Sequence, residues 1–269
     1  MAEVAQSGLS SLVHAFDVAT GVLPRRTSNG IRFASYGETR IVEADLQRIV
    51  KAVPVTMTPA LADRVFYFVP LAMAEASTLA EPHSPNSGST LIARDALPEL
   101  LDEAICHRNV HVPATLQIPA HEGVFISARL LRDTFSLAFE FFINVGHAFA
   151  EQAGIPETFS NLVWSQALAD IRGETSQDAW EIRTAALAHR AEAGNPDEKA
   201  RLDYYEATFA DALAIYQLSL AVDFDYTELR EREYPLIAPN ALADRLRLVA
   251  ALFPPNAGYD FAIRYRRRA

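Results

Sequence analysis

The stretch Arg129–Gln152, RLLRDTFSLAFEFFINVGHAFAEQ, decides most of what the sequence predicts about the fold. At about 100° per residue, its polar side chains fall within about 80° of one another on a helix. Almost all of the remaining helix surface is apolar, whereas a surface helix usually carries a narrow apolar face. We therefore expect the helix over 129–152 to run through the middle of the fold as its most buried long helix. The polar stripe consists of Asp133, Ser136, Glu140, Asn144, His147 and Glu151.

The composition is that of an ordinary globular protein and excludes several classes. The chain has 269 residues, of which 50% are hydrophobic and 22% charged. A formal net charge of -10 argues against nucleic-acid binding. No uncharged apolar run reaches about 18 residues, so no membrane span is expected. The N-terminus lacks the basic start of a signal peptide, which favours a cytoplasmic protein. The single cysteine, Cys106, excludes an intrachain disulfide and a Cys-clustered metal site.

Start and stop signals predict that the second half of the chain is nearly all helical. The start signals are a capping residue followed by proline at the first helical position. The stop signals are Gly or Pro after the helix end. In the first half, Thr58-Pro59 predicts a helix over 60–79 that Pro70 kinks. The predicted helices are 7–20, 43–53, 60–79, 94–106, 129–152, 156–171, 175–193, 196–222 and 239–254.

Alternating apolar and polar residues predict a small sheet. Residues 31–42 carry the pattern of a hairpin with a turn at Tyr36-Gly37-Glu38, and two short strands are expected within 111–127. Residues 259–266 alternate strictly and predict a C-terminal strand that pairs with the N-terminal hairpin. The predicted fold class is mainly α (α+β): a single helical domain over 1–269 with a small antiparallel sheet. A flexible loop is expected near 81–90, which is rich in Pro, Ser, Gly and Asn.

The polar stripe supplies the candidate site residues. Glu140 and His147 are the candidate catalytic pair, because an imidazole held beside a carboxylate in a closed pocket can act near neutral pH. Asn144 and Glu151 lie three and four residues from His147 and could orient it, although an exposed His–Glu pair on a helix surface would look the same. Aromatic residues of the 196–222 helix would complete a pocket where the two helices face each other. The candidate ligand-binding residues are Asn144, Glu151, Tyr205 and Tyr216.

A metal site is an alternative interpretation of the same pattern. The 175–193 helix carries a second stripe of Asp178, Glu181, His189 and Glu192. Carboxylates and imidazoles on packed helices suit iron, manganese or zinc. The competing interpretation is that these side chains form the wet faces of amphipathic helices. No metal ligand is assigned, and no particular cofactor is indicated.

A short match to a catalytic motif occurs at Asp223-Phe224-Asp225-Tyr226-Thr227. The pattern is similar to the Asp-x-Asp-x-Thr nucleophile motif of haloacid-dehalogenase-like phosphatases. In that family the motif ends the first strand of a doubly wound sheet and most of the domain follows it. Here a long helix precedes the motif and only about forty residues follow, so we expect the aspartates to mark the end of the helix.

Three functions remain open from the sequence. The first is a helix-rich protein with a small-molecule pocket along the polar stripe, of unknown activity and with enzyme status undecided. The second is a non-enzymatic interaction protein that self-associates. The third is a helical metalloprotein. None of them involves nucleic acid or a membrane.

Overall fold

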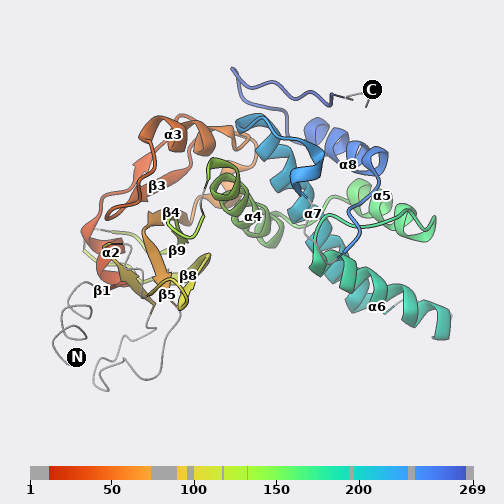
Figure 1. Ribbon diagram of the computed structural model, residues 1–269, viewed down its shortest axis with the longest axis horizontal. Helices are drawn as coiled ribbons and strands as arrows, with labels where there is room; N and C mark the ends of the chain where they lie inside the picture. Colours follow the sequence, from red (N-terminus) through yellow and green to blue (C-terminus); the bar gives the residue numbers. More distant parts are fainter. Residues whose placement is uncertain are drawn as a thin grey trace. The chain divides into compact units, whose positions relative to one another are not determined.

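The computed structural model describes residues 12–73, 90–95, 100–116, 118–131, 133–193, 197–229 and 234–264, without the side chains of 189–193. The loop predicted near 81–90 therefore lies outside the described residues, apart from Thr90. The chain divides into two compact units (Figure 1), and the boundary falls within one helix, between Phe141 and Phe142. We call residues 1–51 with 62–141 the mixed unit, and residues 52–61 with 142–269 the helical unit. That the chain forms a single domain stays a prediction.

The mixed unit is built on a five-stranded sheet of order β2-β3-β4-β9-β8. The three inner strands run parallel, and the two outer strands pair with them antiparallel. All six residues of the central strand are buried, because both faces of the sheet are covered. The helix α3 (Glu43–Ala52) provides the crossover between two parallel neighbours. The strands are β2 (Arg25–Arg26), β3 (Arg32–Ser35), β4 (Arg64–Val69), β8 (His107–Val112) and β9 (His121–Ser127).

A second sheet of four short antiparallel strands belongs to the same unit, in the order β1-β6-β5-β7. The short helix α2 (Ala15–Gly21) contributes Ala15, Val18 and Ala19 to a core that also contains Tyr67 and Phe125. Their two rings stack with centroids 4.7 Å apart. The strands are β1 (Leu12–His14), β5 (Leu71–Met73), β6 (Leu91–Ala93) and β7 (Ala104–Ile105).

These two sheets make the fold class a mixed α/β fold, so the predicted helical domain with a small sheet is wrong. The helix predicted over 60–79 contains β4 and β5 instead. Its apolar run RVFYFV is a strand buried on both faces, which lacks the alternation of a half-exposed strand. The helix predicted over 94–106 is also wrong where it is described, since Ala104–Ile105 is a strand.

The predicted N-terminal hairpin is displaced toward the start of the chain. Its second arm, 39–42, forms no strand. The hairpin that does form joins β2 to β3 through a turn in which the Gly30 N–H donates to Thr27 O. Gly37 does turn the chain, with φ +68°, and a Cβ there would lie 2.3 Å from Arg94 O. The backbone therefore turns where predicted, but the residues after the turn lead to the helix α3 instead of a second strand.

The helices of the helical unit begin at or close to the predicted positions, although α7 begins at Glu198, two residues after the predicted start at 196. Asp197 caps α7 by accepting the N–H groups of Lys199 and Ala200. Every residue of α7 from Thr208 to Leu218 is buried, and the helix packs against α5, α6 and α8 (Figure 1). The helices are α4 (Thr134–Ala153), α5 (Glu157–Leu168), α6 (Gln177–Ala193), α7 (Glu198–Ala221) and α8 (Pro239–Leu252), with short 3-10 turns η1 (Thr58–Leu61) and η3 (Tyr226–Leu229).

The striped helix is α4, and it is shorter and wetter than predicted. It begins at Thr134 rather than Arg129, because Asp133 caps it by accepting the Ser136 N–H at 2.7 Å. His147 and Glu151 are exposed. The helix that is buried on all sides over three turns is α7 instead. No helix among the described residues is long and apolar enough to cross a bilayer.

The predicted C-terminal strand is also wrong for the part that the structure describes. Residues 259–264 belong to no sheet there. The side chains do alternate in burial as the sequence pattern predicts: Phe261 and Ile263 are half-buried, while Asp260 and Ala262 are exposed. The pattern arises because one side of the segment packs on helices, and the Phe261 ring lies 5.2 Å from that of Tyr216.

Candidate ligand-binding groove

Glu140, the first candidate catalytic residue, contacts an imidazole other than the predicted one. Its Oε1 lies 2.6 Å from Nδ1 of His107, which begins β8 in the mixed unit. The Glu140 side chain is 20% exposed and that of His107 is 41% exposed. The neighbouring Cys106 is exposed, and burial together with the Glu140 charge raises the pKa of its thiol. A raised pKa makes this thiol a poor nucleophile near neutral pH.

The other candidate residues on the stripe, Asn144, His147 and Glu151, lie in the helical unit in different environments. His147 and Glu151 are exposed on α4, whereas Asn144 is only 7% exposed. The pairing of Glu140 with His147 in catalysis stays a prediction, as does a ligand contact by Asn144 or Glu151.

The two candidate tyrosines on α7 have partners within the protein. Tyr216 is fully buried, and its hydroxyl donates to Phe253 O at 2.7 Å. Burial raises the pKa of Tyr216 to about 12. Tyr205 is half-buried, with its ring 6.2 Å from that of Trp164 and 6.0 Å from the Arg201 guanidinium carbon. Burial raises the pKa of Tyr205 as well.

The second stripe does not form a metal centre in the part of the chain described. No group of three His, Cys, Asp or Glu side chains there could hold a metal ion. Glu181 accepts a hydrogen bond from the Gln177 amide one turn earlier, at 2.8 Å. The side chains of His189 and Glu192 lie outside the described residues.

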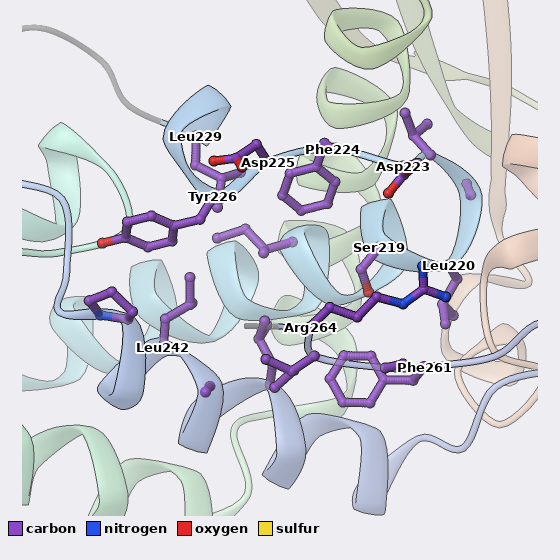
Figure 2. Close-up of a pocket in the computed structure, with 18 of the residues that line it drawn as sticks. Ser219, Leu220, Asp223, Phe224, Asp225, Tyr226, Leu229, Leu242, Phe261 and Arg264 are labelled. Atoms are coloured by element: carbon purple, nitrogen blue, oxygen red, sulfur yellow. The ribbon is translucent and has the colours of Figure 1, made fainter. Parts of the chain in front are cut away.

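A large groove lies elsewhere in the helical unit, where sequence reasoning placed no site (Figure 2). It has a volume of about 1070 Å³. Its walls are the end of α7, the connection through η3, the first half of α8 and the segment 260–264. It is lined by Ile215, Ser219, Leu220, Ala221, Val222, Asp223, Phe224, Asp225, Tyr226, Thr227, Leu229, Pro239, Leu242, Ala243, Leu246, Asp260, Phe261, Ala262, Ile263 and Arg264.

Local capping shapes one wall of this groove. The helix α7 ends at Ala221 and the chain becomes extended at Val222. The Asp225 carboxylate accepts both the backbone N–H and the hydroxyl of Thr227, at 3.0 and 2.8 Å, which starts η3. The predicted role of Asp223 and Asp225 at a helix end is therefore confirmed.

The opposite wall is held by contacts at the end of α8. The hydrogen bond from Tyr216 to Phe253 O joins α7 to this end. Asn256 then fixes the turn, because its amide donates to Val53 O at 2.7 Å and accepts the Val55 N–H at 2.8 Å. The chain returns along the helices through 260–264, and Figure 2 shows Phe261 and Arg264 on this segment.

The groove combines an apolar floor with a charged rim. Leu242, Leu246 and Ile215 are among the buried aliphatic residues of the floor. The described residues of the exposed rim include three carboxylates and one guanidinium: Asp223, Asp225, Asp260 and Arg264. Among the residues that the structure describes, no His, Cys, Lys or Glu side chain lines it. The groove therefore has the apolar lining with a few polar groups that is typical of small-molecule pockets. The motif match at 223–227 and the alternation of 259–264 were the sequence features that fall on it.

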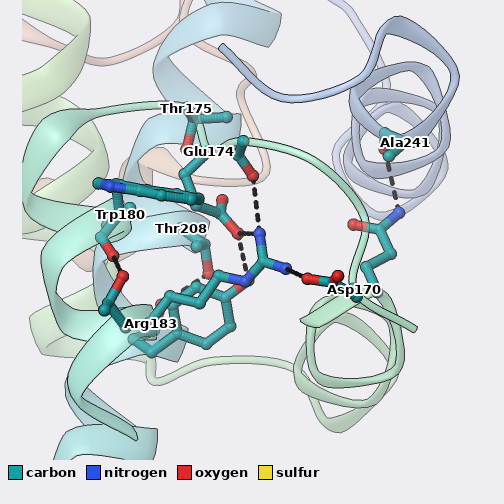
Figure 3. Close-up of polar contacts among 12 residues, drawn as sticks. Asp170, Glu174, Thr175, Trp180, Arg183, Thr208 and Ala241 are labelled. Carbon is teal, nitrogen blue, oxygen red and sulfur yellow. Dashed lines mark hydrogen bonds and ion pairs between the residues drawn. The ribbon is translucent and has the colours of Figure 1, made fainter. Parts of the chain in front are cut away.

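A buried polar cluster in the helical unit centres on Glu174 (Figure 3). The Glu174 carboxylate accepts two hydrogen bonds from the Arg245 guanidinium, at 2.8 and 3.3 Å, and one from the Tyr204 hydroxyl at 2.6 Å. Arg183 approaches the same carboxylate at 3.6 Å and donates to Gly173 O. We call these residues the Glu174 network. Its side chains are paired and no more than 4% exposed, so it has no room for a ligand.

No protein family, curated protein or solved structure matches the chain.

Proposed function

We propose that the protein binds a small amphipathic molecule in the groove of the helical unit. The observation that carries this proposal is the groove itself, whose volume of about 1070 Å³ and apolar floor suit a ligand of drug or short-lipid size. Exposed apolar surface of this kind has a cost in water that a bound apolar chain would remove. The charged rim would orient the polar end of the ligand.

The apolar dye Nile red tests this proposal, with a groove-filling variant and a matched control. Ser219 lines the groove near the end of α7, and its hydroxyl donates to the carbonyl of Tyr216 three residues earlier. Ser165 makes the same bond to Leu162 O on α5 and is not among the lining residues. Ser219→Trp therefore fills the groove, while Ser165→Trp makes the same change elsewhere.

We expect saturable Nile red fluorescence with the wild-type protein and the Ser165→Trp variant. Ser219→Trp should weaken the dye affinity by about 10-fold or more, because the tryptophan ring occupies apolar surface that the dye would otherwise bury. Circular dichroism of each variant verifies the helix content. Non-saturable fluorescence, or equal affinity in the two folded tryptophan variants, would rule out the groove as the binding site.

A further inference from the structure

The segment Asp260–Arg264 is extended but belongs to no sheet among the described residues. No backbone hydrogen bond involves these five residues within the described parts of the chain. The segment contains no turn or bend, and its side chains alternate between half-buried and exposed. An extended chain with unpaired N–H and C=O groups is a template for another strand.

The sequence of this segment, DFAIR, is complementary to itself in the antiparallel direction. If two copies pair about a two-fold axis at Ala262, Asp260 of each copy lies opposite Arg264 of the other. Phe261 then lies opposite Ile263, and Ala262 meets its own copy. Opposite charges and aromatic–aliphatic pairs are the cross-strand neighbours that stabilise antiparallel pairing.

We propose that the segment Asp260–Arg264 pairs with the same segment of a second copy to form a symmetric dimer. Strand hydrogen bonds lie in the plane of the sheet and side chains lie above and below it. Pairing therefore leaves Phe261 and Ile263 packed on the helices of their own copy. The interface is isologous, which is the usual arrangement for a homodimer.

This proposal does not rest on ligand binding in the groove. A dimer is detected by its mass without any ligand, and dye binding is measured on dilute protein. One result can therefore fail while the other holds. Because a two-stranded ribbon is only marginally stable, we expect a weak dimer with a Kd of roughly 10 to 100 µM.

Charge reversal tests the pairing and its register in sedimentation equilibrium of the full chain. Arg264→Asp places two aspartates opposite each other at both ends of the ribbon and should raise the dimer Kd about 10-fold. Asp260→Arg should act similarly with two arginines. The double variant D260R/R264D restores opposite charges at both ends and should return the Kd to within about 3-fold of wild type. Arg247→Asp, at an exposed arginine of α8, is the matched control and should change little.

Cysteine cross-linking tests the position of the two-fold axis in a Cys106→Ser background. Residues directly opposite in an antiparallel pair have Cα atoms about 4.5 to 5.5 Å apart, which a disulfide can span. Ala262→Cys should therefore give a covalent dimer on mild oxidation. Ala257→Cys, also exposed, is the control, because residue 257 lies in the turn before the paired segment and its two copies would not face each other across the two-fold axis.

A monomeric wild-type protein at about 300 µM, well above the expected Kd, would overturn the proposal. So would a dimer that Arg264→Asp leaves intact, a double variant that does not recover, or equal cross-linking at 257 and 262. Weakening by each single reversal, recovery in the double variant and selective cross-linking at 262 would support it.

Discussion

The Glu174 network and the rim of the groove both contain carboxylates and guanidinium groups, but the first is buried and the second is exposed. In the Glu174 network, Arg245 and Glu174 are each 1% exposed and hydrogen-bonded to each other. At the rim of the groove, Asp223 and Asp260 are exposed, and no ion pair involves them among the described residues. The difference indicates that the network contributes to folding, whereas the groove remains available for binding. Variants in the two regions should therefore change different measurements.

The largest effect is expected when the buried ion pair is broken. Glu174→Gln leaves the Arg245 guanidinium buried without a counter-charge, which should lower the free energy of unfolding by about 3 to 5 kcal/mol. Urea unfolding followed by circular dichroism measures this loss. Glu198→Gln removes an exposed pair with Arg201 and should cost less than about 1 kcal/mol. Equal losses in the two variants would mean that the network is not what stabilises the unit.

Backbone packing beside the network gives a second comparison. Gly173 has φ +80°, and a Cβ there would lie 2.3 Å from both Pro235 O and Leu236 O. Gly154 has φ +73° with nothing within 4 Å. Gly154→Ala should cost about 1 kcal/mol for the left-handed conformation alone, and Gly173→Ala about 3 kcal/mol because backbone must also move. Thermal unfolding of both variants tests this, and a Gly173→Ala variant no less stable than Gly154→Ala would contradict the close approach.

The pH dependence of stability should reveal a buried carboxyl group next to the network. Burial raises the pKa of Asp211, although Thr175 donates a hydrogen bond to it at 2.7 Å. A raised pKa in the folded state gives stability that is complete below the unfolded pKa of about 3.9 and is lost as pH rises through the folded value. Asp211→Asn removes this pH-dependent loss of stability, and its amide oxygen can still accept the hydrogen bond from the Thr175 hydroxyl.

The stability of Asp211→Asn relative to wild type should therefore increase with pH above about 4, by at most about 1.4 kcal/mol per pH unit. Urea unfolding from pH 4 upward measures the difference. A difference that is flat or falls with pH would show that the carboxyl group is charged in the fold without penalty.

The smallest effect is expected at the exposed rim, on binding rather than stability. The described residues of the rim carry three carboxylates and one guanidinium, which should favour decyltrimethylammonium over decyl sulfate, both below their micellar concentrations. Asp223→Asn should lower the affinity for decyltrimethylammonium by about 2- to 5-fold, which is the effect expected of an exposed charge pair. Asp244→Asn on α8, outside the lining residues, is the control for displacement of Nile red. Tighter binding of decyl sulfate would show that Arg264 controls the rim instead.

Much of the helical unit could be predicted from the sequence, because its helices begin at local signals. Pro239 opens α8 as predicted, whereas α7 begins two residues after its predicted start because Asp197 caps it. The strands β4 and β5 could not be predicted in the same way. Their residues are buried on both sides, so helix and strand give the same unbroken apolar run.

The candidate site was harder to predict than the helices. Ser219, Leu242 and Phe261 come from three separate segments, and only the fold brings them to one groove. The buried network also depends on the fold, because Gln166 accepts a hydrogen bond at 2.7 Å from Arg245, which lies on another helix. The alternation of 259–264 was visible, but the sequence did not show whether a strand or helices would lie beside it.

Hydrogen exchange followed by mass spectrometry tests most directly that the groove binds ligand while the network only stabilises. The full chain is compared with and without decyltrimethylammonium. We predict slower exchange in Ser219–Asp225, which lines the groove, and unchanged exchange in Gly173–Thr175 beside the network. No slowing in Ser219–Asp225 at saturating ligand, or equal slowing in both segments, would contradict the account.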